Sequence, residues 1–477
     1  MRTSLFLALL LLPLPLWATP WHVYEGQSIQ AAINGAVAGD DVIVHPGTYY
    51  ESITLKAGVD VYSFEGSSSV TIDGGANNHT VYFSGNGGGL HFGSQSGGQD
   101  GGFTIDGSAH YGMYFNGCWN MHLGDIHVVS DPPIWDPWQP DGAVYFYNSG
   151  YQQFGVANLR IHGQTACKGL YLEHCDIAFN DLHVYDVTGT GAHLFWDSSY
   201  FTDPVISGCG KGFELWHSDV FVDGGSIEDC TFGIWASEDP YYYYDHYTFM
   251  GVDFQYCTTG VCFTPQAPFT MEAYLISCTF EYCTNGVSLT RVNGHVKGCD
   301  FLHIDDVALA CSGNGGALIL GGPTVGEWND FYDVTGVGVH VTGGASPTVE
   351  GSFHSVFGTG ILCEGGSTPT IRDCILDGSN GCFEGIATSG ENTMATIRYC
   401  SLRDYASPVS PGPRAAIAYR ATANLGTLAS HGENNFEDNT CDLWYSNKAA
   451  VPDYLYAQMN WWGDSPPDAG SFGGRVD

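Results

Sequence analysis

The feature that most constrains the fold of this 477-residue chain is a frame that recurs between residues 156 and 291. Each unit begins at a glycine and continues as a short run in which apolar and variable residues alternate. The frame glycines, which are 22, 21, 21, 27 and 26 residues apart, are Gly169, Gly191, Gly212, Gly233, Gly260 and Gly286. Such a repeat indicates a stacked architecture, because one unit cannot bury its apolar face without its neighbours.

The alternation within each unit predicts β-strands. Apolar residues recur at every second position, whereas a helical repeat needs them at spacings of three and four. Gly, Asp, Asn and Thr separate the runs, so each unit consists of two or three short strands joined at corners. We therefore predict that a unit is one coil of a parallel β-helix. A β-propeller blade needs about 40–50 residues, and a leucine-rich repeat needs an Asn/Leu ladder that the sequence lacks.

The N-terminal segment predicts export. Residues 1–18 carry a basic residue, Arg2, near their start, continue as an apolar run too short to span a membrane and end at Ala18, as a secretory signal peptide does. No later apolar run is long enough for a membrane helix. We expect a soluble protein that is secreted or held at the cell surface, without insertion into a membrane.

Charge narrows the range of partners. Lys and Arg total 14 against 51 Asp and Glu, which gives a formal net charge of −37. Nucleic-acid binding depends on clustered basic charge, so this composition excludes nucleic acid as a partner. A neutral polysaccharide is compatible with such a surface, and an anionic one needs bridging cations or a local basic patch. We expect the protein to be a monomer.

Sixteen cysteines in an exported chain raise the question of disulfides. Four of them lie three residues before a frame glycine and should stack as a column: Cys209, Cys230, Cys257 and Cys283. Neighbouring strands lie ~4.8 Å apart, which permits disulfides along the column without requiring them. Buried thiols that pack as small apolar side chains are the favoured interpretation, and disulfides are the alternative.

A short helix precedes the strands and introduces a family resemblance. Ser28 fits an N-cap, Ile29 and Ile33 form an apolar face, and Gly35 ends the helix. Together with residues 39–49, this helix resembles the N-terminal cap and first coils of right-handed β-helix proteins of the pectin-lyase-like superfamily. The Asn-x-Trp-Gly-x-x-x-Pro arrangement at residues 460–467 resembles the closing segment of many secreted bacterial members.

The resemblance implies an all-β fold, a single-stranded right-handed parallel β-helix with a short N-terminal capping helix. On this basis residues 19–105 form the cap and first coils, residues 106–445 the β-helix and residues 446–477 a C-terminal capping segment. Comparable proteins often continue into a sorting or anchoring module, and whether this chain does so beyond Asp477 is left open.

The phase of the frame separates the interior from the surface. Residues one and three after each frame glycine are apolar and should point inward, so those two and four after it should point outward. The outward set is Tyr171, His193, Glu214, Trp235, Glu173, Phe195, Trp216 and Ser237. Because aromatic faces stack on sugar rings, we assign substrate binding to Tyr171, Trp216 and Trp235. Trp135 and Trp138 of the Pro-rich insertion at residues 132–140 join them.

The same outward face holds the candidate catalytic residues. Carboxylate and imidazole groups form hydrogen bonds with sugar hydroxyls or transfer protons, which makes Glu173, His193 and Glu214 candidate catalytic residues. Lys168 and Lys211 each precede a frame glycine by one residue. A lyase needs a base and a group that neutralises a sugar carboxylate, and the resemblance implies Lys or Arg with bound calcium in that role. The alternative for the lysines is a solubilising role at turns.

Calcium is the candidate cofactor. Asp253, Glu281 and Asp300 are the candidates for its ligands, because stacked carboxylates repel one another unless a cation lies between them. Ordinary acidic surface is the alternative in so negative a chain.

The leading functional hypothesis is an exported β-helix protein that binds extracellular polysaccharide along the outward face. Whether it also cleaves the polysaccharide, as a lyase or glycoside hydrolase, is left undecided, since a shared fold does not fix an activity. The alternative is a non-catalytic cell-surface or adhesion rod, in which the coils are a spacer and the aromatic residues pack or contact proteins.

Overall fold

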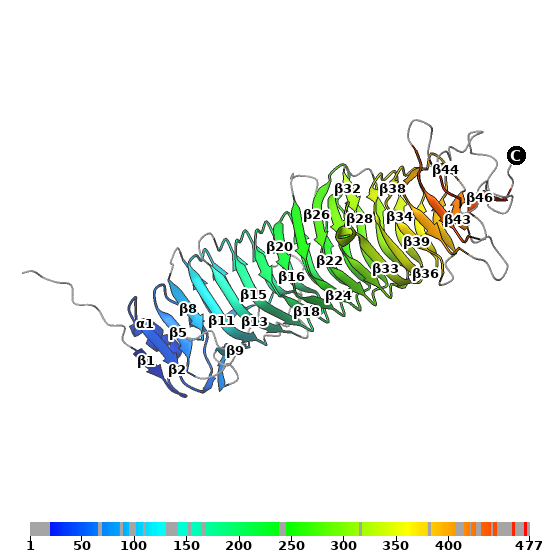
Figure 1. Ribbon diagram of the computed structural model, residues 1–477. Coiled ribbons are helices and arrows are strands. Elements are labelled where there is room, and N and C mark those ends of the chain that lie inside the picture. The colour runs from blue at the N-terminus through cyan, green and yellow to red at the C-terminus, as the bar shows by residue number, and fades with distance from the viewer. Residues whose placement is uncertain are drawn as a thin grey trace, which may run out of the picture.

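The chain forms an elongated rod of stacked coils, seen in a computed structural model (Figure 1). The blue end carries the helix α1, Ile29–Gly35, and the coils follow one another to the orange and red end. The structure describes residues 20–64, 69–85, 89–94, 102–107, 111–129, 142–150, 154–163, 168–237, 245–313, 317–379, 383–405, 415–419, 421–425, 431–439, 442–445, 460–462 and 472–474. The predicted signal peptide, residues 1–18, lies outside the described residues.

The strands form three parallel ladders, one for each face of the coil. Ladder I consists of β4 (Ile53–Thr54), β7 (His79–Ser84), β10 (Tyr111–Asn116), β12 (Val144–Tyr147), β14 (Lys168–Glu173), β16 (Thr190–Phe195), β19 (Lys211–Trp216), β22 (Phe232–Ala236), β25 (Thr259–Phe263), β28 (Asn285–Thr290), β31 (Val307–Ser312), β34 (Val337–Thr342), β37 (Thr359–Cys363), β40 (Glu384–Thr388), β43 (Ala415–Tyr419), β46 (Leu443–Tyr445) and β47 (Phe472–Gly474). The frame glycines predicted this ladder, since each sits in or beside one of its central strands.

Ladder II follows ladder I around each coil. It consists of β1 (Pro20–Val23), β2 (Asp41–Val44), β5 (Asp60–Ser63), β8 (Leu90–Gly93), the first halves of β11 (Met121–Val128), β13 (Gly155–His162) and β15 (Ala178–Tyr185), then β17 (Tyr200–Thr202), β20 (Asp219–Asp223), β23 (His246–Met250), β26 (Met271–Ile276), β29 (Val292–Lys297), β32 (Leu318–Leu320), β35 (Thr348–Val349), β38 (Thr370–Arg372), β41 (Met394–Arg398) and β44 (Thr422–Asn424).

Ladder III completes the coil. It consists of β3 (Gly47–Tyr49), β6 (Val70–Asp73), β9 (Phe103–Asp106), the second halves of β11, β13 and β15, then β18 (Val205–Ser207), β21 (Ser226–Glu228), β24 (Asp253–Gln255), β27 (Thr279–Glu281), β30 (Asp300–Leu302), β33 (Asn329–Val334), β36 (Gly351–Val356), β39 (Ile375–Asp377), β42 (Ser401–Arg403) and β45 (Asn435–Glu437). Ladders II and III make one 30-stranded sheet, because β11, β13 and β15 bend and serve both. The predicted parallel β-helix is confirmed.

The frame glycines mark the closest approach between neighbouring coils. A Cβ atom on Gly212 would lie 2.4 Å from the carbonyl oxygen of Gly233 and 2.7 Å from Cγ2 of Ile227. A Cβ atom on Gly233 would lie at the same distance, 2.4 Å, from the carbonyl oxygen of Gly260. Only a residue without a side chain fits, because the core is already close-packed there. The repeat in the sequence therefore records a steric requirement of the stacked coils.

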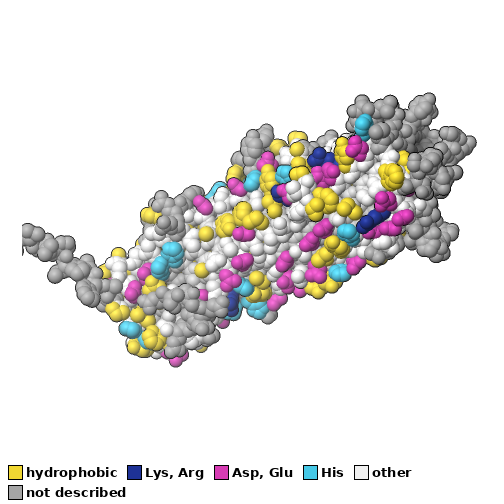
Figure 2. Space-filling model, in the orientation of Figure 1, with side chains coloured by type: hydrophobic (Ala, Val, Ile, Leu, Met, Phe, Trp, Pro, Cys, Tyr) yellow, Lys and Arg dark blue, Asp and Glu magenta, His cyan; other side chains and the backbone are white. Residues whose placement is uncertain are grey.

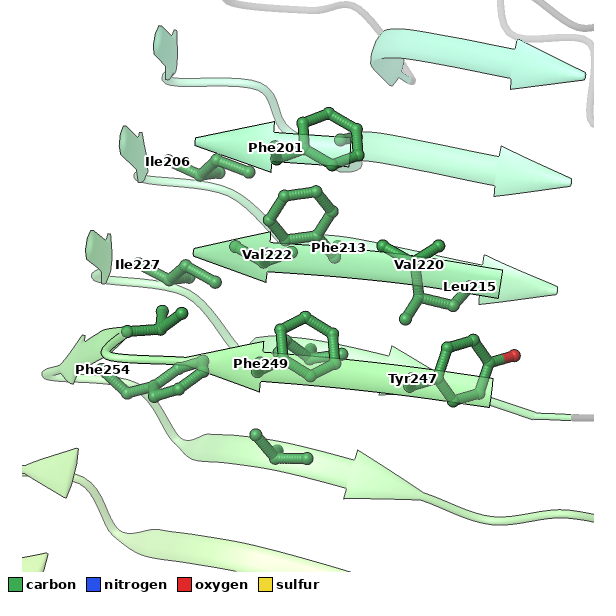
Figure 3. Packing of buried hydrophobic residues seen from close by; sticks show 14 of the residues in the cluster. Phe201, Ile206, Phe213, Leu215, Val220, Val222, Ile227, Tyr247, Phe249 and Phe254 are labelled. Carbon is green, nitrogen blue, oxygen red and sulfur yellow. The ribbon is translucent and has the colours of Figure 1, made fainter. Parts of the chain in front are cut away.

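The interior is a continuous stack of apolar side chains. Figure 3 shows Phe201, Phe213, Phe249 and Phe254 projecting from neighbouring coils into one core. Further along, the rings of Phe254 and Phe280 stack with centroids 4.8 Å apart and an interplanar angle of 3°. Burying a Phe side chain contributes about 1.5–3 kcal/mol, so the stack is a main source of stability. The inward positions predicted from the frame are all buried.

The cysteine column lies inside the core. Cys209, Cys230, Cys257 and Cys283 are all buried, and all cysteines of the described residues are free thiols. Backbone hydrogen bonds connect their coils, with Thr258 N donating to the Cys230 carbonyl oxygen at 3.0 Å. The thiols thus occupy the positions that small apolar side chains take elsewhere in the core.

The helix α1 begins where its cap residue predicts. The Ser28 Oγ accepts a hydrogen bond from Ala31 N at 3.0 Å and donates one to Glu51 Oε2 at 2.8 Å. Glu51 Oε1 also accepts from Ile29 N at 2.6 Å, so a carboxylate sits at the start of the helix. Ile29 and Ile33 enter the core. The expectation that α1 caps the open end of the coil stays a prediction.

The closing segment packs on the last coils. Trp462 stacks on Phe436 with centroids 4.6 Å apart, Asn460 Nδ2 donates to the Leu425 carbonyl oxygen at 3.1 Å, and Trp461 is exposed. The remainder of the motif, residues 463–467, lies outside the described residues.

The domain boundaries drawn from the sequence stay predictions. Among the described residues there is no helix with the length and apolar character needed to cross a membrane.

Candidate functional site

The outer face of ladder I brings most of the predicted site residues together. Tyr171 pairs with His193, His193 with Glu214 and Glu214 with Trp235, so four successive coils contribute one column. A second column on the same strands contains Glu173, Phe195 and Trp216. We call the following residues the ladder I cluster: Tyr145, Lys168, Tyr171, Glu173, Thr190, His193, Lys211, Glu214, Trp216 and Trp235.

The cluster is less exposed than its outward phase predicts. Tyr171 is 8% exposed and Glu214 is 9% exposed, while His193 and Trp235 are half-buried. Side chains on neighbouring coils cover one another: the Tyr171 ring centroid lies 4.8 Å from that of Tyr145 and 4.9 Å from that of His193. The expected open stripe is therefore corrected to a packed layer of aromatic and charged side chains on the outer face of ladder I.

Glu214 is the centre of the polar contacts in this layer. Its Oε2 accepts hydrogen bonds from Thr190 Oγ1 at 2.6 Å and lies 3.1 Å from His193 Nδ1. Its Oε1 lies 2.6 Å from Lys211 Nζ and 3.4 Å from Trp216 Nε1. A buried carboxylate is stable only when it is paired and hydrogen-bonded, and here four donors surround it.

The environment of Glu214 and His193 sets their charge. Burial acts to raise the pKa of Glu214, but the hydrogen bond and charge of His193 and the ammonium group of Lys211 outweigh it, so the pKa lies well below its usual range. Burial lowers the pKa of His193, and the charges of Lys168 and Lys211 add to this effect against the Glu214 hydrogen bond. At neutral pH the site therefore holds an ionised Glu214 and a neutral His193.

Both lysines lie over aromatic rings of the cluster. Lys168 Nζ is 4.2 Å from the centroid of the Tyr171 ring, and Lys211 Nζ is 3.7 Å from a ring centroid of Trp235. A cation over a ring face is attracted by the ring quadrupole. The solubilising role considered for these lysines does not describe Lys211, which pairs with Glu214 and Trp235.

Glu173 belongs to the upstream part of the cluster. Its Oε2 accepts a hydrogen bond from the Tyr145 hydroxyl at 2.6 Å. Burial raises the pKa of Tyr145, and the Glu173 hydrogen bond and charge add to it, so the phenol stays protonated. Burial likewise raises the pKa of Tyr171, followed by the charge of Glu173.

The proposed metal ligands are not brought together. Asp253 and Asp300 share a column of ladder III, but Thr279 stands between them in the register. Glu281 lies in the neighbouring column, paired with Gln255 and Leu302. No group of His, Cys, Asp or Glu within the described ranges has the arrangement that would hold a metal ion. Calcium binding has no structural support from these three residues.

Two members of the cluster were not singled out from the sequence. Tyr145 continues the central column one coil before the frame, and Thr190 donates to Glu214 from the position beside Gly191. The alternation in residues 143–147 gave a signal for Tyr145, because it has the same phase as Tyr171. Trp135 and Trp138, assigned to substrate binding, lie outside the described residues.

The fold and a family comparison define the class of this protein. The family model described as right handed beta helix region matches residues 241–405 and 285–451, and the ladders continue on its N-terminal side through the same kind of coil. The chain thus folds as a right-handed parallel β-helix, as the resemblance implied. No curated protein sequence matches it.

Solved structures of similar shape are distant. The N-terminal fragment of bacteriophage Phi29 gene product 12 is 12% identical, with a TM-score of 0.36, 87% of this chain and 79% of that chain being covered. The A-module of the Azotobacter vinelandii mannuronan C-5 epimerase AlgE4 is 13% identical, with a TM-score of 0.31 and coverage of 91% and 95%. A polygalacturonase from Erwinia carotovora is 9% identical, with a TM-score of 0.20 and coverage of 91% and 96%. These likenesses carry no argument about what this chain binds.

Proposed function

We propose that the ladder I cluster is the polysaccharide-binding surface of an exported protein. The observation that carries the proposal is the position of Glu214. This ionised side chain lies outside the hydrophobic core, and four neighbouring polar groups hold it in place. Trp216 and Trp235, both half-buried, flank it with ring centroids 5.8 Å apart. Partly exposed indoles beside fixed polar groups suit sugar rings, which have both apolar faces and hydroxyls.

The charge distribution favours a neutral or weakly charged polysaccharide. Figure 2 shows acidic side chains spread along the visible face and only scattered Lys and Arg. Lys168 and Lys211 are the local exception, because both lie in the cluster and its ring contacts. Sugar carboxylates can therefore be accepted at this place on a surface that otherwise repels them.

The His193–Glu214 contact favours a second candidate function, cleavage by elimination. Glu214 orients the imidazole, so that Nδ1 carries the proton and Nε2 presents a lone pair. In a lyase step, His193 Nε2 would take the proton next to a sugar carboxylate, the electrons would form a carbon–carbon double bond, and the adjacent glycosidic C–O bond would break. The leaving oxygen would take its proton from water or from the Tyr171 phenol, which burial keeps protonated.

Hydrolysis by a pair of carboxylic acids suits the site less well. A glycosidase needs one carboxyl group that stays protonated at neutral pH as the general acid. The pKa of Glu214 is shifted in the opposite direction, after the effect of burial is outweighed by His193 and Lys211. Glu214 is thus assigned a positioning role, with His193 as the candidate base.

The test is binding to immobilised polysaccharides by affinity electrophoresis, with neutral and uronate-containing chains and with calcium or EGTA. Trp235→Ala should abolish the retardation seen with the wild-type chain, because it removes the indole and the contact of Lys211. The matched control is Tyr332→Ala, which removes an exposed aromatic side chain from ladder III. Equal retardation of both variants would contradict binding at the ladder I cluster, and no retardation of the wild-type chain with any polysaccharide would favour the non-catalytic rod.

A further inference from the structure

The turn from ladder I into ladder II has the same form in five successive coils. Each of the strands β10, β12, β14, β16 and β19 is followed by one residue with a left-handed backbone, whose φ angle lies between 48° and 67°. The side chain after that residue is buried. We call these buried positions the corner column: Cys118, Ser149, Cys175, Asp197 and Ser218. The column thus combines thiols and hydroxyls with a single carboxyl group.

The corner column is a set of hydrogen-bond donors. In three of its coils the side chain donates to the backbone carbonyl oxygen two residues earlier. The donor and acceptor residues are Ser149 Oγ with Tyr147 at 2.9 Å, Cys175 Sγ with Glu173 at 3.3 Å, and Ser218 Oγ with Trp216 at 2.8 Å. Other turns follow the same rule, since Cys230 Sγ donates to the Glu228 carbonyl oxygen at 3.2 Å. The position therefore requires a side chain that carries a proton to donate.

The acceptor carbonyl has the same surroundings in each coil. It also accepts a backbone N–H group from the left-handed residue of the preceding coil, as the Trp216 carbonyl oxygen does from Trp196 N at 3.1 Å. In the coil of Asp197 the equivalent acceptor is the Phe195 carbonyl oxygen, which accepts from His174 N at 3.1 Å. By position, its second donor is the Asp197 side chain. A carboxyl group donates only when it is protonated.

The contacts of Asp197 fit a protonated carboxyl group. The residue is 1% exposed, and its Oδ1 accepts a hydrogen bond from Ser199 N at 2.7 Å. Its Oδ2 is buried, and the described part of the chain offers this oxygen no donor. An ionised carboxylate is costly in such a place, whereas a carboxylic acid turns the bare oxygen into a donor. Burial raises the pKa of Asp197 to about 7; the hydrogen bonds from Ser199 oppose this shift, and the charge of Asp176 adds to it.

Titratable groups face Asp197 from both neighbouring coils. Asp176, on the preceding coil, opposes its ionisation by charge. The charge of Asp197 in turn adds to burial in raising the pKa of the Cys175 thiol well above its usual range. The other titratable residues of these turns are His174, His217 and Asp219. None of the strongest influences on the pKa of Asp197 is a cation, so ionisation of this group is not compensated by a neighbouring positive charge.

We propose that Asp197 is a protonated carboxylic acid inside the rod, whose Oδ2–H group donates to the Phe195 carbonyl oxygen and makes the stability of the central coils depend on pH. When the proton is lost to water, a charge replaces the donor, and the turn between β16 and β17 loosens. The stabilisation is complete below the unfolded-state pKa of an aspartate, about 3.9, and is lost as pH rises towards the folded-state value. This inference does not rest on the ladder I cluster, to which Asp197 does not belong.

Asp197→Asn is the central test, because an amide keeps the acceptor for Ser199 N and supplies a permanent N–H donor for the Phe195 carbonyl oxygen. Urea unfolding of the full chain, followed by tryptophan fluorescence, gives the folding equilibrium constant of each protein. The ratio of the variant's constant to that of the wild type should rise by about tenfold or more between pH 5 and pH 8.

A second variant and a control complete the series. Asp197→Ser places at this position the donor found at Ser149 and Ser218, so its stability relative to the wild type should rise with pH in the same way. Asp305→Asn, which changes an exposed carboxyl group, is the matched control and should follow the wild type at every pH.

Infrared spectroscopy observes the proton directly. The wild-type chain at pH 5.5 should show the C=O stretching band of a protonated carboxyl group that disappears by pH 9 and is missing from Asp197→Asn. Because this band can be titrated in the wild type alone, the proposal stays testable if a variant does not fold. Either of two results would overturn it: a stability ratio that stays constant or falls as pH rises, or a wild-type spectrum without the band at pH 5.5.

Discussion

His193 Nδ1 lies 3.1 Å from Glu214 Oε2, with the two residues paired side by side on neighbouring strands of ladder I. The contact joins coils that are 21 residues apart in the sequence. It determines which imidazole nitrogen carries the proton, and so which nitrogen can act as a base.

The contact predicts separate effects on binding and cleavage. If the chain cleaves a uronate-containing polysaccharide, His193→Gln should lower kcat by at least about 100-fold, as loss of a general base does, and leave retardation on the same polysaccharide within about twofold. Release of unsaturated products, followed by ultraviolet absorbance, measures the activity. An active His193→Gln variant would refute the assignment of His193 as the base.

Glu214→Gln should destabilise the protein in a pH-dependent way. The pKa of Glu214 is lowered in the folded state, because His193 and Lys211 outweigh the effect of burial. A lowered pKa stabilises the fold above the unfolded-state pKa of about 4.3 and ceases to do so as pH falls through the folded-state value. We expect the variant to lose about 1–3 kcal/mol at pH 7.

The difference between wild type and Glu214→Gln should shrink as the pH is lowered below about 4. Urea midpoints of both proteins at pH 7, 5 and 3.5, read by tryptophan fluorescence, give the comparison. Thr190→Val serves as a control, since it removes one hydrogen bond to Glu214 without changing charge. A difference that grows towards acid pH would contradict the lowered pKa.

Gly212→Ala should be destabilising by about 1–3 kcal/mol, because the new methyl group would overlap the Gly233 carbonyl oxygen on the next coil. Gly326→Ala is a matched control: a Cβ there meets nothing within 4 Å. Urea unfolding of the two variants tests the difference. Equal midpoints would show that the frame glycines are not sterically required.

Cys262 should be the most reactive of the thiols in the described residues. It is half-buried, whereas the other described cysteines are buried. Burial raises its pKa, so its reaction with a disulfide reagent should be slow at pH 7 and faster at pH 9. Cys262→Ser should reduce by one the number of thiols per folded molecule that react slowly with the reagent. If the buried thiols of Cys209, Cys230, Cys257 and Cys283 reacted as fast as that of Cys262, the coils that carry them would have to unfold locally to expose them.

The sequence predicted the fold and the phase of its side chains, because both follow from short-range patterns. Period two alternation identified the strands, and the frame glycines identified their stacking. The burial of Tyr171 and Glu214 was not predictable in this way, since it depends on what each neighbouring coil places beside them. Glu214 has four polar neighbours, and Thr190 among them lies 24 residues away.

The separation of the acids proposed as calcium ligands could not be predicted from the sequence either. Asp253 and Asp300 share a column, but an intervening coil with Thr279 separates them, and only the register reveals it.

The close fit of Gly212 against Gly233 also bears on how such a chain can change its length. The carbonyl oxygen of each frame glycine from Gly191 to Gly286 approaches the frame glycine of the preceding coil, so these glycines all pack against their neighbouring coils in the same way. Removing or duplicating the stretch from one frame glycine to the next therefore rejoins matching surfaces, whereas cutting elsewhere shifts strands by part of a turn. Segments of 21, 22, 26 or 27 residues that run from one frame glycine to the next are thus interchangeable units, and a deletion that does not run from one frame glycine to another should unfold the rod.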